Sequence, residues 1–373
     1  MGIVFIPAWF AGRLMPGLTP ARPRAGRFRV IARMAVAAVA LMLAWNPSNA
    51  GAASPEAFNP SPHAIEIPRW FKETFLDFRE DIAEAAAEGK RLMVYFGQDG
   101  CPYCQRLMRV NFSQKDIVEK TRRHFNAVAI NMWGDREVTW TDGKARREKD
   151  FAAVLKVQFT PTLLFFDEKG AVVLRLNGYY PPHKFQVALD YVAGKLENKI
   201  AFAEYLRRHV REPASGVLNH QPFLLKPPLD LAAQRKRSGK SLAVLFEQTQ
   251  CAACDELHRE GFAAPAVRKL IGKMDFARVG LFGDEKLVTP DGRVLAAREW
   301  GRQLGVAYTP TIVFFDEAGK EVFRVDAYLR PFHLASSLDY VASKAYLQQP
   351  SFQRYLQARA ESVRKTGGTV ELW

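Results

Sequence analysis

The chain has 373 residues, of which 48% are hydrophobic and 25% are charged, and its formal net charge is +14. This composition is ordinary for globular protein, and the length is sufficient for two or three domains. The first 50 residues hold six arginines and no acidic residue, so the formal net charge of the remaining residues is only +8. Its basic residues are interleaved with acidic ones, which indicates a solvated basic surface and argues against a nucleic-acid partner. Four cysteines in so long a chain exclude a fold held together by disulfides.

The amino-terminal 50 residues have the pattern of a secretory signal peptide. Basic residues 1–33 precede an apolar stretch at 34–45, and small residues follow up to Ala50. A stretch of this length is too short to span a bilayer, which favours a cleaved signal peptide (1–50) over an uncleaved membrane anchor. The mature protein is therefore expected in the periplasm, an oxidising compartment, and its first segment is expected to be a tether of small, polar and proline residues at 51–67.

All four cysteines fall in two Cys-x-x-Cys pairs, and each pair follows a predicted strand. In the first, the apolar run Leu92–Phe96 is short and bounded by turn residues, as is typical of a buried strand. Cys101 then opens a predicted helix with Pro102 at its first position. Unpaired N–H groups at a helix start favour a thiolate there, and Cys104 lies one turn further, within disulfide reach. The pattern predicts a reversible redox pair, because a disulfide closing so short a loop stabilises a fold little.

The elements predicted around this pair alternate between helix and strand. An amphipathic helix is expected from Trp70 to Gly89, and a second strand at 126–132. Residues 133–148 are polar and turn-rich and are interpreted as an insertion. A short helix, a Thr-Pro-Thr segment, a β-hairpin and a longer helix follow in that order, at Phe151–Val157, Thr160–Thr162, Leu163–Leu176 and Pro182–Leu196.

The same order of motifs returns about 150 residues later. Gly239–Phe246 matches Gly89–Phe96, and the second cysteine pair, Cys251 and Cys254, falls at the same offset. Two units of this length indicate a tandem duplication and not a solenoid, whose repeats are shorter. The predicted organisation is a first domain, a proline-rich linker, a second domain and a C-terminal tail, at 68–212, 213–227, 228–360 and 361–373.

The cysteines also raise the question of a metal or haem site. Zinc is disfavoured because 146 residues separate the two pairs. Covalent haem is excluded because Gln105 and Asp255 stand where haem attachment requires histidine. His258 lies four residues after Cys254 on the same predicted helical face, so a Cys/Cys/His copper site stands as an alternative to a partly exposed histidine. The redox interpretation itself needs no cofactor and no metal.

Taken together, these motifs resemble the thioredoxin superfamily. More narrowly, they resemble its exported members, typified by the periplasmic thioredoxin of sulfur-oxidation clusters. The matching features are Phe246-Glu247-Gln248, Trp133–Val138 and the Thr-Pro-Thr block with its following Phe-Phe-Asp, and the resemblance covers residues 70–205 and 222–356. It implies an α/β fold of two tandem thioredoxin-like domains, each with a central mixed sheet flanked by helices, preceded by the signal peptide.

The resemblance also implies roles for the matching residues. Cys101 and Cys251 would be the exposed nucleophiles, and Cys104 and Cys254 the resolving thiols. A cis-proline beside each nucleophile and the threonine before it would bind an extended substrate segment, at Thr160 and Pro161 in the first repeat and at Thr309 and Pro310 in the second.

One departure from the familiar thioredoxin pattern concerns the proton of the resolving thiol. Thioredoxin keeps a buried aspartate six residues before its first cysteine, where this chain has Tyr95 and Leu245. Proton transfer must therefore use water or a neighbour such as Asp99 or Glu247.

The expected function is thiol–disulfide exchange on protein or small-molecule disulfides, as a reductase or relay, with protein disulfides as substrates. A reductase implies a membrane electron donor, because the periplasm has no thioredoxin reductase of its own. Two alternatives of other classes are a thioredoxin-fold binding or chaperone module without turnover, and a copper chaperone using Cys251, Cys254 and His258. The sequence carries no signal for an oligomeric state.

Charges near the two pairs predict different reduction potentials. Arg106 and Arg109 favour the thiolate of Cys101, whereas acidic residues cluster around Cys251, namely Glu247, Asp255, Glu256 and Glu260. A nucleophile with a lower pKa makes its pair more oxidising, so the second pair is expected to be the more reducing one.

Overall fold

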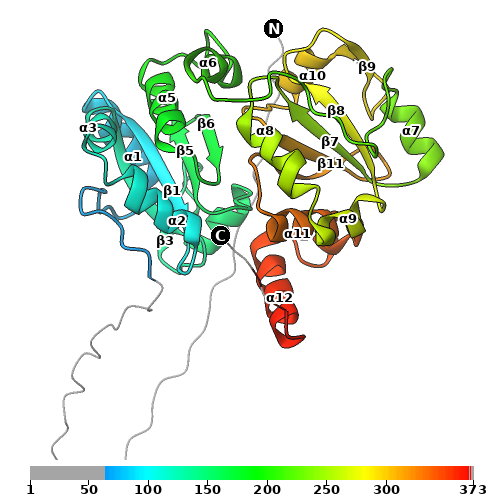
Figure 1. Cartoon of the computed structure of the whole chain (residues 1–373). Coiled ribbons are helices and arrows are strands. Elements are labelled where there is room, and N and C mark those ends of the chain that lie inside the picture. Colours follow the sequence, from blue (N-terminus) through cyan, green and yellow to red (C-terminus); the bar gives the residue numbers. More distant parts are fainter. Residues whose placement is uncertain (1–63, 369, 371–373) are drawn as a thin grey trace, which may run out of the picture. The chain divides into compact units, whose positions relative to one another are not determined.

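The computed structural model describes residues 64–368 and residue 370 (Figure 1). The predicted signal peptide, and the predicted tether as far as residue 63, lie outside these residues. Across the described part of the chain, we find no helix with the length and apolar character needed to cross a membrane.

The first repeat is built on a four-stranded mixed sheet with the order β2-β1-β5-β6. β1 and β2 are parallel, and β5 runs antiparallel to both β1 and β6. The elements in chain order are α1 (Phe78–Ala87), β1 (Arg91–Gly97), α2 (Pro102–Arg106), the π-helical turn η1 (Leu107–Asn111), α3 (Lys115–His124), β2 (Phe125–Asn131), β3 (Glu137–Thr139), β4 (Ala145–Arg147), α4 (Glu148–Val154), β5 (Thr162–Phe166), β6 (Val172–Asn177), α5 (Pro182–Ala193) and α6 (Phe202–His209).

The alternation of side chains along β1 divides the core of this repeat into two layers. Met93 and Tyr95 face the layer formed with η1, α3, α5 and α6. Leu92, Val94 and Phe96 face the opposite layer, which includes α1 and α4. Both faces of β1 are therefore buried, which explains why its sequence is a continuous apolar run and not an alternating one.

The second repeat has the same topology, with the strand order β12-β11-β7-β8. Its strands β7, β8 and β11 are labelled in Figure 1. β7 and β8 are parallel, and β11 is antiparallel to β7 and β12. The elements are α7 (Leu231–Ser238), β7 (Leu242–Glu247), α8 (Ala252–Glu256), the π-helical turn η2 (Leu257–Gly261), α9 (Pro265–Ile271), β8 (Asp275–Gly280), β9 (Lys286–Val288), β10 (Val294–Ala296), α10 (Ala297–Gln303), β11 (Thr311–Phe315), β12 (Glu321–Val325), α11 (Pro331–Ala342), the 3₁₀ turn η3 (Ala345–Leu347) and α12 (Phe352–Lys365).

The first helix is shorter than the sequence pattern predicts. The expected helix from Trp70 is wrong in its first two turns, because α1 begins at Phe78. Asp77 caps the helix by accepting a hydrogen bond from the Arg79 N–H, and Leu76 before it has a positive φ of 60°. Phe75, which the helical pattern places on the buried face, is 98% exposed.

Two other expected elements are displaced by a few residues. The predicted insertion at 133–148 contains the small hairpin β3–β4, which is followed directly by α4, so α4 starts three residues before the predicted Phe151. The predicted helix to Leu196 stops at Ala193, since Gly194 is its C-cap and Lys195 has a positive φ of 53°. Such a conformation ends a helix.

The segment predicted to be the linker is tied to the second repeat. The Ser215 N–H and hydroxyl and the Asn219 amide all donate to the Asp255 carboxylate, each over 2.7 Å. Further along, Leu224 is buried and forms a β-bridge with Phe276 of β8. Much of this segment therefore packs as a part of the second repeat.

Candidate active site

The first cysteine pair sits where β1 gives way to α2. Cys101 is the N-cap of α2, with Pro102 at the first helical position, as the sequence predicts. Its Sγ accepts a hydrogen bond from the Cys104 N–H over 3.1 Å. The two cysteines form a disulfide, and their exposed fractions are 4% and 0%, so the expected exposure of Cys101 is wrong for this state. A backbone N–H directed at this sulfur stabilises a thiolate when the pair is reduced.

The Thr160–Pro161 segment lies against the first cysteine. The peptide bond between these two residues is cis. The Thr160 hydroxyl lies 3.3 Å from Cys101 Sγ, and the Thr160 carbonyl oxygen lies 3.4 Å from the same sulfur. The fold thus brings together two sequence motifs that are 59 residues apart.

The second pair has the same local geometry. Cys251 is the N-cap of α8, and its Sγ accepts the Cys254 N–H over 3.1 Å. The cysteines form a disulfide with a Cα–Cα distance of 5.2 Å, equal to that of the first pair. The Thr309–Pro310 bond is also cis.

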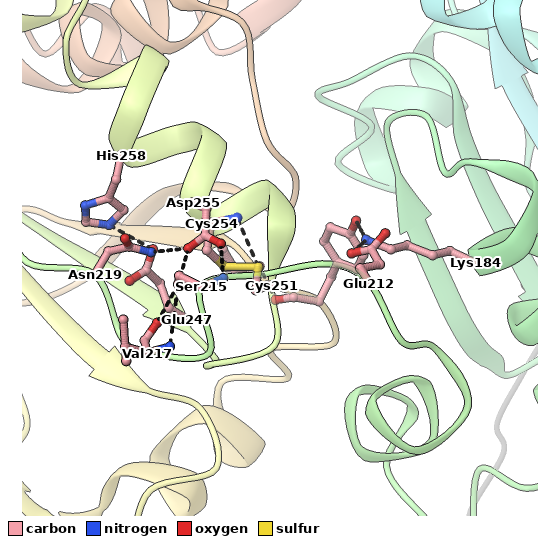
Figure 2. Close-up of a disulfide and its surroundings, with 12 residues drawn as sticks. Lys184, Glu212, Ser215, Val217, Asn219, Glu247, Cys251, Cys254, Asp255 and His258 are labelled. Carbon is pink, nitrogen blue, oxygen red and sulfur yellow. Dashed lines mark hydrogen bonds and ion pairs between the residues drawn. A yellow bond between two sulfur atoms is a disulfide. The ribbon is translucent and has the colours of Figure 1, made fainter.

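His258 is engaged by a carboxylate in the second repeat. Its Nε2 lies 2.9 Å from Oε1 of Glu247, and both side chains are almost fully buried (Figure 2). Among the described residues, no group of three or more His, Cys, Asp and Glu side chains is placed to hold a metal ion. Cys251 and Cys254 form a disulfide in this structure, so the copper set of Cys251, Cys254 and His258, expected as an alternative, would require their reduction.

Two other acidic residues near the cysteines are held by polar contacts. Asp99 is exposed and accepts the Ile65 N–H over 3.1 Å. Asp255 is held by Ser215 and Asn219 (Figure 2). Burial alone would raise the pKa of Asp255, but these hydrogen bonds outweigh it and lower the pKa overall. Asp255 therefore stays charged beside the second pair.

Both cysteine motifs contribute to one cleft of about 730 Å³. Its lining includes Cys101 and Tyr103 from the first repeat and Ala252 and Ala253, the dipeptide between the cysteines of the second. The size is typical of sites for small ligands or short peptide segments.

A buried lysine in the wall of this cleft was not found by sequence reasoning. Lys184 of α5 donates to the Tyr308 hydroxyl over 3.0 Å and pairs with Glu212 over 3.0 Å. Burial would lower the pKa of Lys184, but Tyr308 and Glu212 raise it overall. The three residues come from distant segments, and no local spacing signals that they meet.

Comparisons with known proteins agree with this fold. The family described as thioredoxin-like domain matches residues 78–193 and 229–342, together more than half of the chain. A comparison with curated proteins finds no match.

Among solved structures, three similar proteins each cover about one third of this chain. A thioredoxin-fold protein from Helicobacter pylori is 24% identical, with 32% of this chain and 78% of that chain covered and a TM-score of 0.28. A putative disulphide-isomerase from Bacteroides thetaiotaomicron is 28% identical over 35% of this chain and 92% of its own, with a TM-score of 0.27. A thioredoxin from Thermus thermophilus is 28% identical over 32% of this chain and 85% of its own, with a TM-score of 0.26. On the two family matches, the chain belongs to the thioredoxin-like domain family, of which it carries two tandem copies.

Proposed function

We propose that this protein is a thiol–disulfide oxidoreductase in which both Cys-x-x-Cys pairs cycle between dithiol and disulfide. The observation that carries the proposal is the repeated geometry, in which a cysteine at a helix start accepts an N–H bond from its partner cysteine. In each copy the Cys101 or Cys251 thiolate attacks a substrate disulfide and displaces one substrate thiolate. The resolving cysteine, Cys104 or Cys254, then attacks the mixed disulfide and releases the second thiolate.

The substrate is held by the segment before each cis-proline. The position of Thr160 against Cys101 Sγ supports this role in the first copy. Thr160 and Pro161, with Thr309 and Pro310 as their counterparts, would align an extended segment so that its disulfide reaches the nucleophile. We propose protein disulfides in the periplasm as substrates, with a membrane protein as electron donor.

The shared cleft supports electron exchange between the two pairs as well as with substrate. Its lining includes Cys101 of the first pair and Ala252 and Ala253, which lie between the cysteines of the second, so the second motif borders the cleft that holds the first nucleophile. The protein would then act as a reductase or as a relay.

Reduction of insulin disulfides, with dithiothreitol as the electron source, tests the proposal. The full mature chain is expected to accelerate the reduction, and the variant with serine at all four cysteines is expected to be inactive. If the serine variant equals the parent, the chain is a binding module and the proposal is wrong.

A further inference from the structure

The second copy contains a buried acid–base pair that the exchange reaction described above does not use. Glu247 is the last residue of β7 and is 0% exposed, and His258 lies in η2 and is 6% exposed. Their hydrogen bond joins the strand that leads to Cys251 to the helical segment that follows Cys254 (Figure 2). Burying two ionisable groups costs free energy even when they are paired, so this pair calls for a functional explanation.

The pair lies on the same side of the sheet as the disulfide. Along β7, Ala243 and Leu245 face the layer that contains Leu257 of η2, whereas the intervening residues face the opposite layer. Side chains alternate along a strand, so Glu247, two residues after Leu245, points to the η2 side. His258 follows Cys254 by four residues, in the π-helical turn that directly continues α8.

Each member of the pair keeps one hydrogen-bonding atom without a partner. Within the described chain, Oε2 of Glu247 and Nδ1 of His258 have no hydrogen-bond partner. Glu247 also borders a hollow of about 680 Å³ that is lined by Thr249, Gln250 and Gly280, among others. The hollow thus lies beside a glutamate whose side chain is itself 0% exposed.

Other charged groups surround the pair. The charge of His258 contributes to the lowered pKa of Asp255 on α8, and Arg259 borders the same surface hollow as His258. Arg278 of β8 donates to the Asn219 carbonyl next to Asp255. The hollow beside Glu247 is also lined by Glu285, Arg207 and Arg211.

The first copy lacks this arrangement. Gly97 and Met108 occupy the positions of Glu247 and His258. The Tyr95 ring fills the space, because a Cβ built on Gly97 would overlap the Tyr95 hydroxyl. Burial, reinforced by the charge of Asp99, raises the pKa of Tyr95, so its hydroxyl keeps its proton near neutral pH.

We propose that Glu247, positioned by His258, accepts the proton of Cys254 when Cys254 resolves the mixed disulfide on Cys251, and that the first copy has no such acceptor. This inference rests on the proposed thiol–disulfide exchange. The Cys254 thiol gives its proton to the Glu247 carboxylate, directly or through a water molecule. The resulting thiolate attacks Cys251 Sγ, the Cys251–Cys254 disulfide forms, and the substrate sulfur leaves as a thiolate. Glu247 then releases the proton to solvent.

The two steps can be timed separately with dithiobis(nitrobenzoate), an aromatic disulfide that releases one coloured thiolate at each step. The parent is the reduced full mature chain carrying Cys101→Ser and Cys104→Ser, so that only the second pair reacts. Attack by Cys251 releases the first thiolate, and attack by Cys254 releases the second. Stopped-flow traces from pH 5 to pH 9 give the rate of each phase.

Glu247→Gln is expected to slow the second phase at pH 6 by at least about tenfold and to leave the first phase unchanged. Its second phase should rise about tenfold per pH unit, because Cys254 must then ionise unaided up to the usual thiol pKa of about 8.5. His258→Met, which installs the residue of the first copy, is expected to slow the second phase less. A second phase of parental rate in Glu247→Gln, or equal slowing of both phases, would overturn the proposal, and a parental rate in His258→Met would remove His258 from it.

The first copy supplies the matched control. With Cys251→Ser and Cys254→Ser in place, its second phase should already follow the steep pH profile, and Tyr95→Phe should not change it. This comparison needs no substitution in the buried pair, so it decides the question even if Glu247→Gln does not fold. If both copies give the same shallow profile, the inference is wrong. If no second equivalent of thiolate appears at all, the proposed function fails instead.

Discussion

Asp81→Asn is expected to stabilise the first repeat at alkaline pH and to leave its stability unchanged at acid pH. Asp81 lies in α1 and is only 4% exposed. Burial raises the pKa of Asp81 from 3.8 to about 6, although a hydrogen bond from the Thr74 hydroxyl and the charge of Lys72 both lower it. The folded protein therefore holds a proton on Asp81 that the unfolded chain has already lost.

The sign of the effect follows from proton binding. Between pH 3.8 and about 6 the folded state binds more protons at Asp81 than the unfolded state does, so the free energy of unfolding falls as the pH rises. The difference between the two pKa values corresponds to about 3 kcal/mol in the free energy of unfolding, and this contribution is fully lost above pH 7. Asparagine is neutral throughout and still offers an oxygen to Thr74. Relative to the parent, Asp81→Asn should thus raise the free energy of unfolding by up to about 3 kcal/mol at pH 8 and by almost nothing at pH 4.

Urea unfolding followed by tryptophan fluorescence measures this difference. Trp140 reports on the region, because its ring lies 5.5 Å from that of Phe78, the first residue of α1. Glu80→Gln is the control, since Glu80 is an exposed acid in the first turn of the same helix and should contribute less than about 1 kcal/mol. A gain that is equal at pH 4 and pH 8, or a loss at pH 8, would refute the reasoning.

Three further predictions concern the reaction and its location. Pro161→Ala should lower turnover of a protein disulfide and accumulate mixed disulfides, visible on non-reducing gels; turnover equal to the parent would count against the substrate-binding role. Amino-terminal sequencing of periplasmic protein should begin near Gly51, and recovery of residues 34–45 would instead establish a membrane anchor. Redox-buffer titration can measure the reduction potential of each pair in the full chain when the other pair is replaced by serine. The second pair should be the more reducing one, by at most about 30 mV for each unit by which the pKa values of Cys101 and Cys251 differ. Equal or inverted potentials would remove a relay from the second pair to the first.

The duplication made much of the fold predictable from sequence. A buried apolar strand, a Cys-x-x-Cys helix start and a Thr-Pro-Thr segment recur at nearly constant spacing, and the structure gives both copies the same sheet order. Each of these signals is local, since it depends on side-chain periodicity and turn residues within about ten positions. The positions of Cys101 and Cys251 at helix starts were predictable for that reason.

Helix limits were less predictable where the backbone overrides periodicity. The apolar spacing after Trp70 suits a helix, yet a positive φ at Leu76 and the Asp77 cap move the start to Phe78. Apolar periodicity shows which side chains could share a face, but it does not show where the chain turns.

The environment of the resolving thiol was decided by tertiary structure. Sequence offered Asp99 and Glu247 equally as neighbours of the cysteines, and His258 as either a partly exposed histidine or a copper ligand. Folding separates them, because Asp99 is exposed and accepts a backbone N–H, whereas Glu247 points to the side of the sheet that faces η2 and meets His258. Glu247 and His258 are eleven residues apart. Whether they meet depends on which face of β7 the glutamate occupies and on the direction in which η2 points the histidine, and both are set when the two elements pack together.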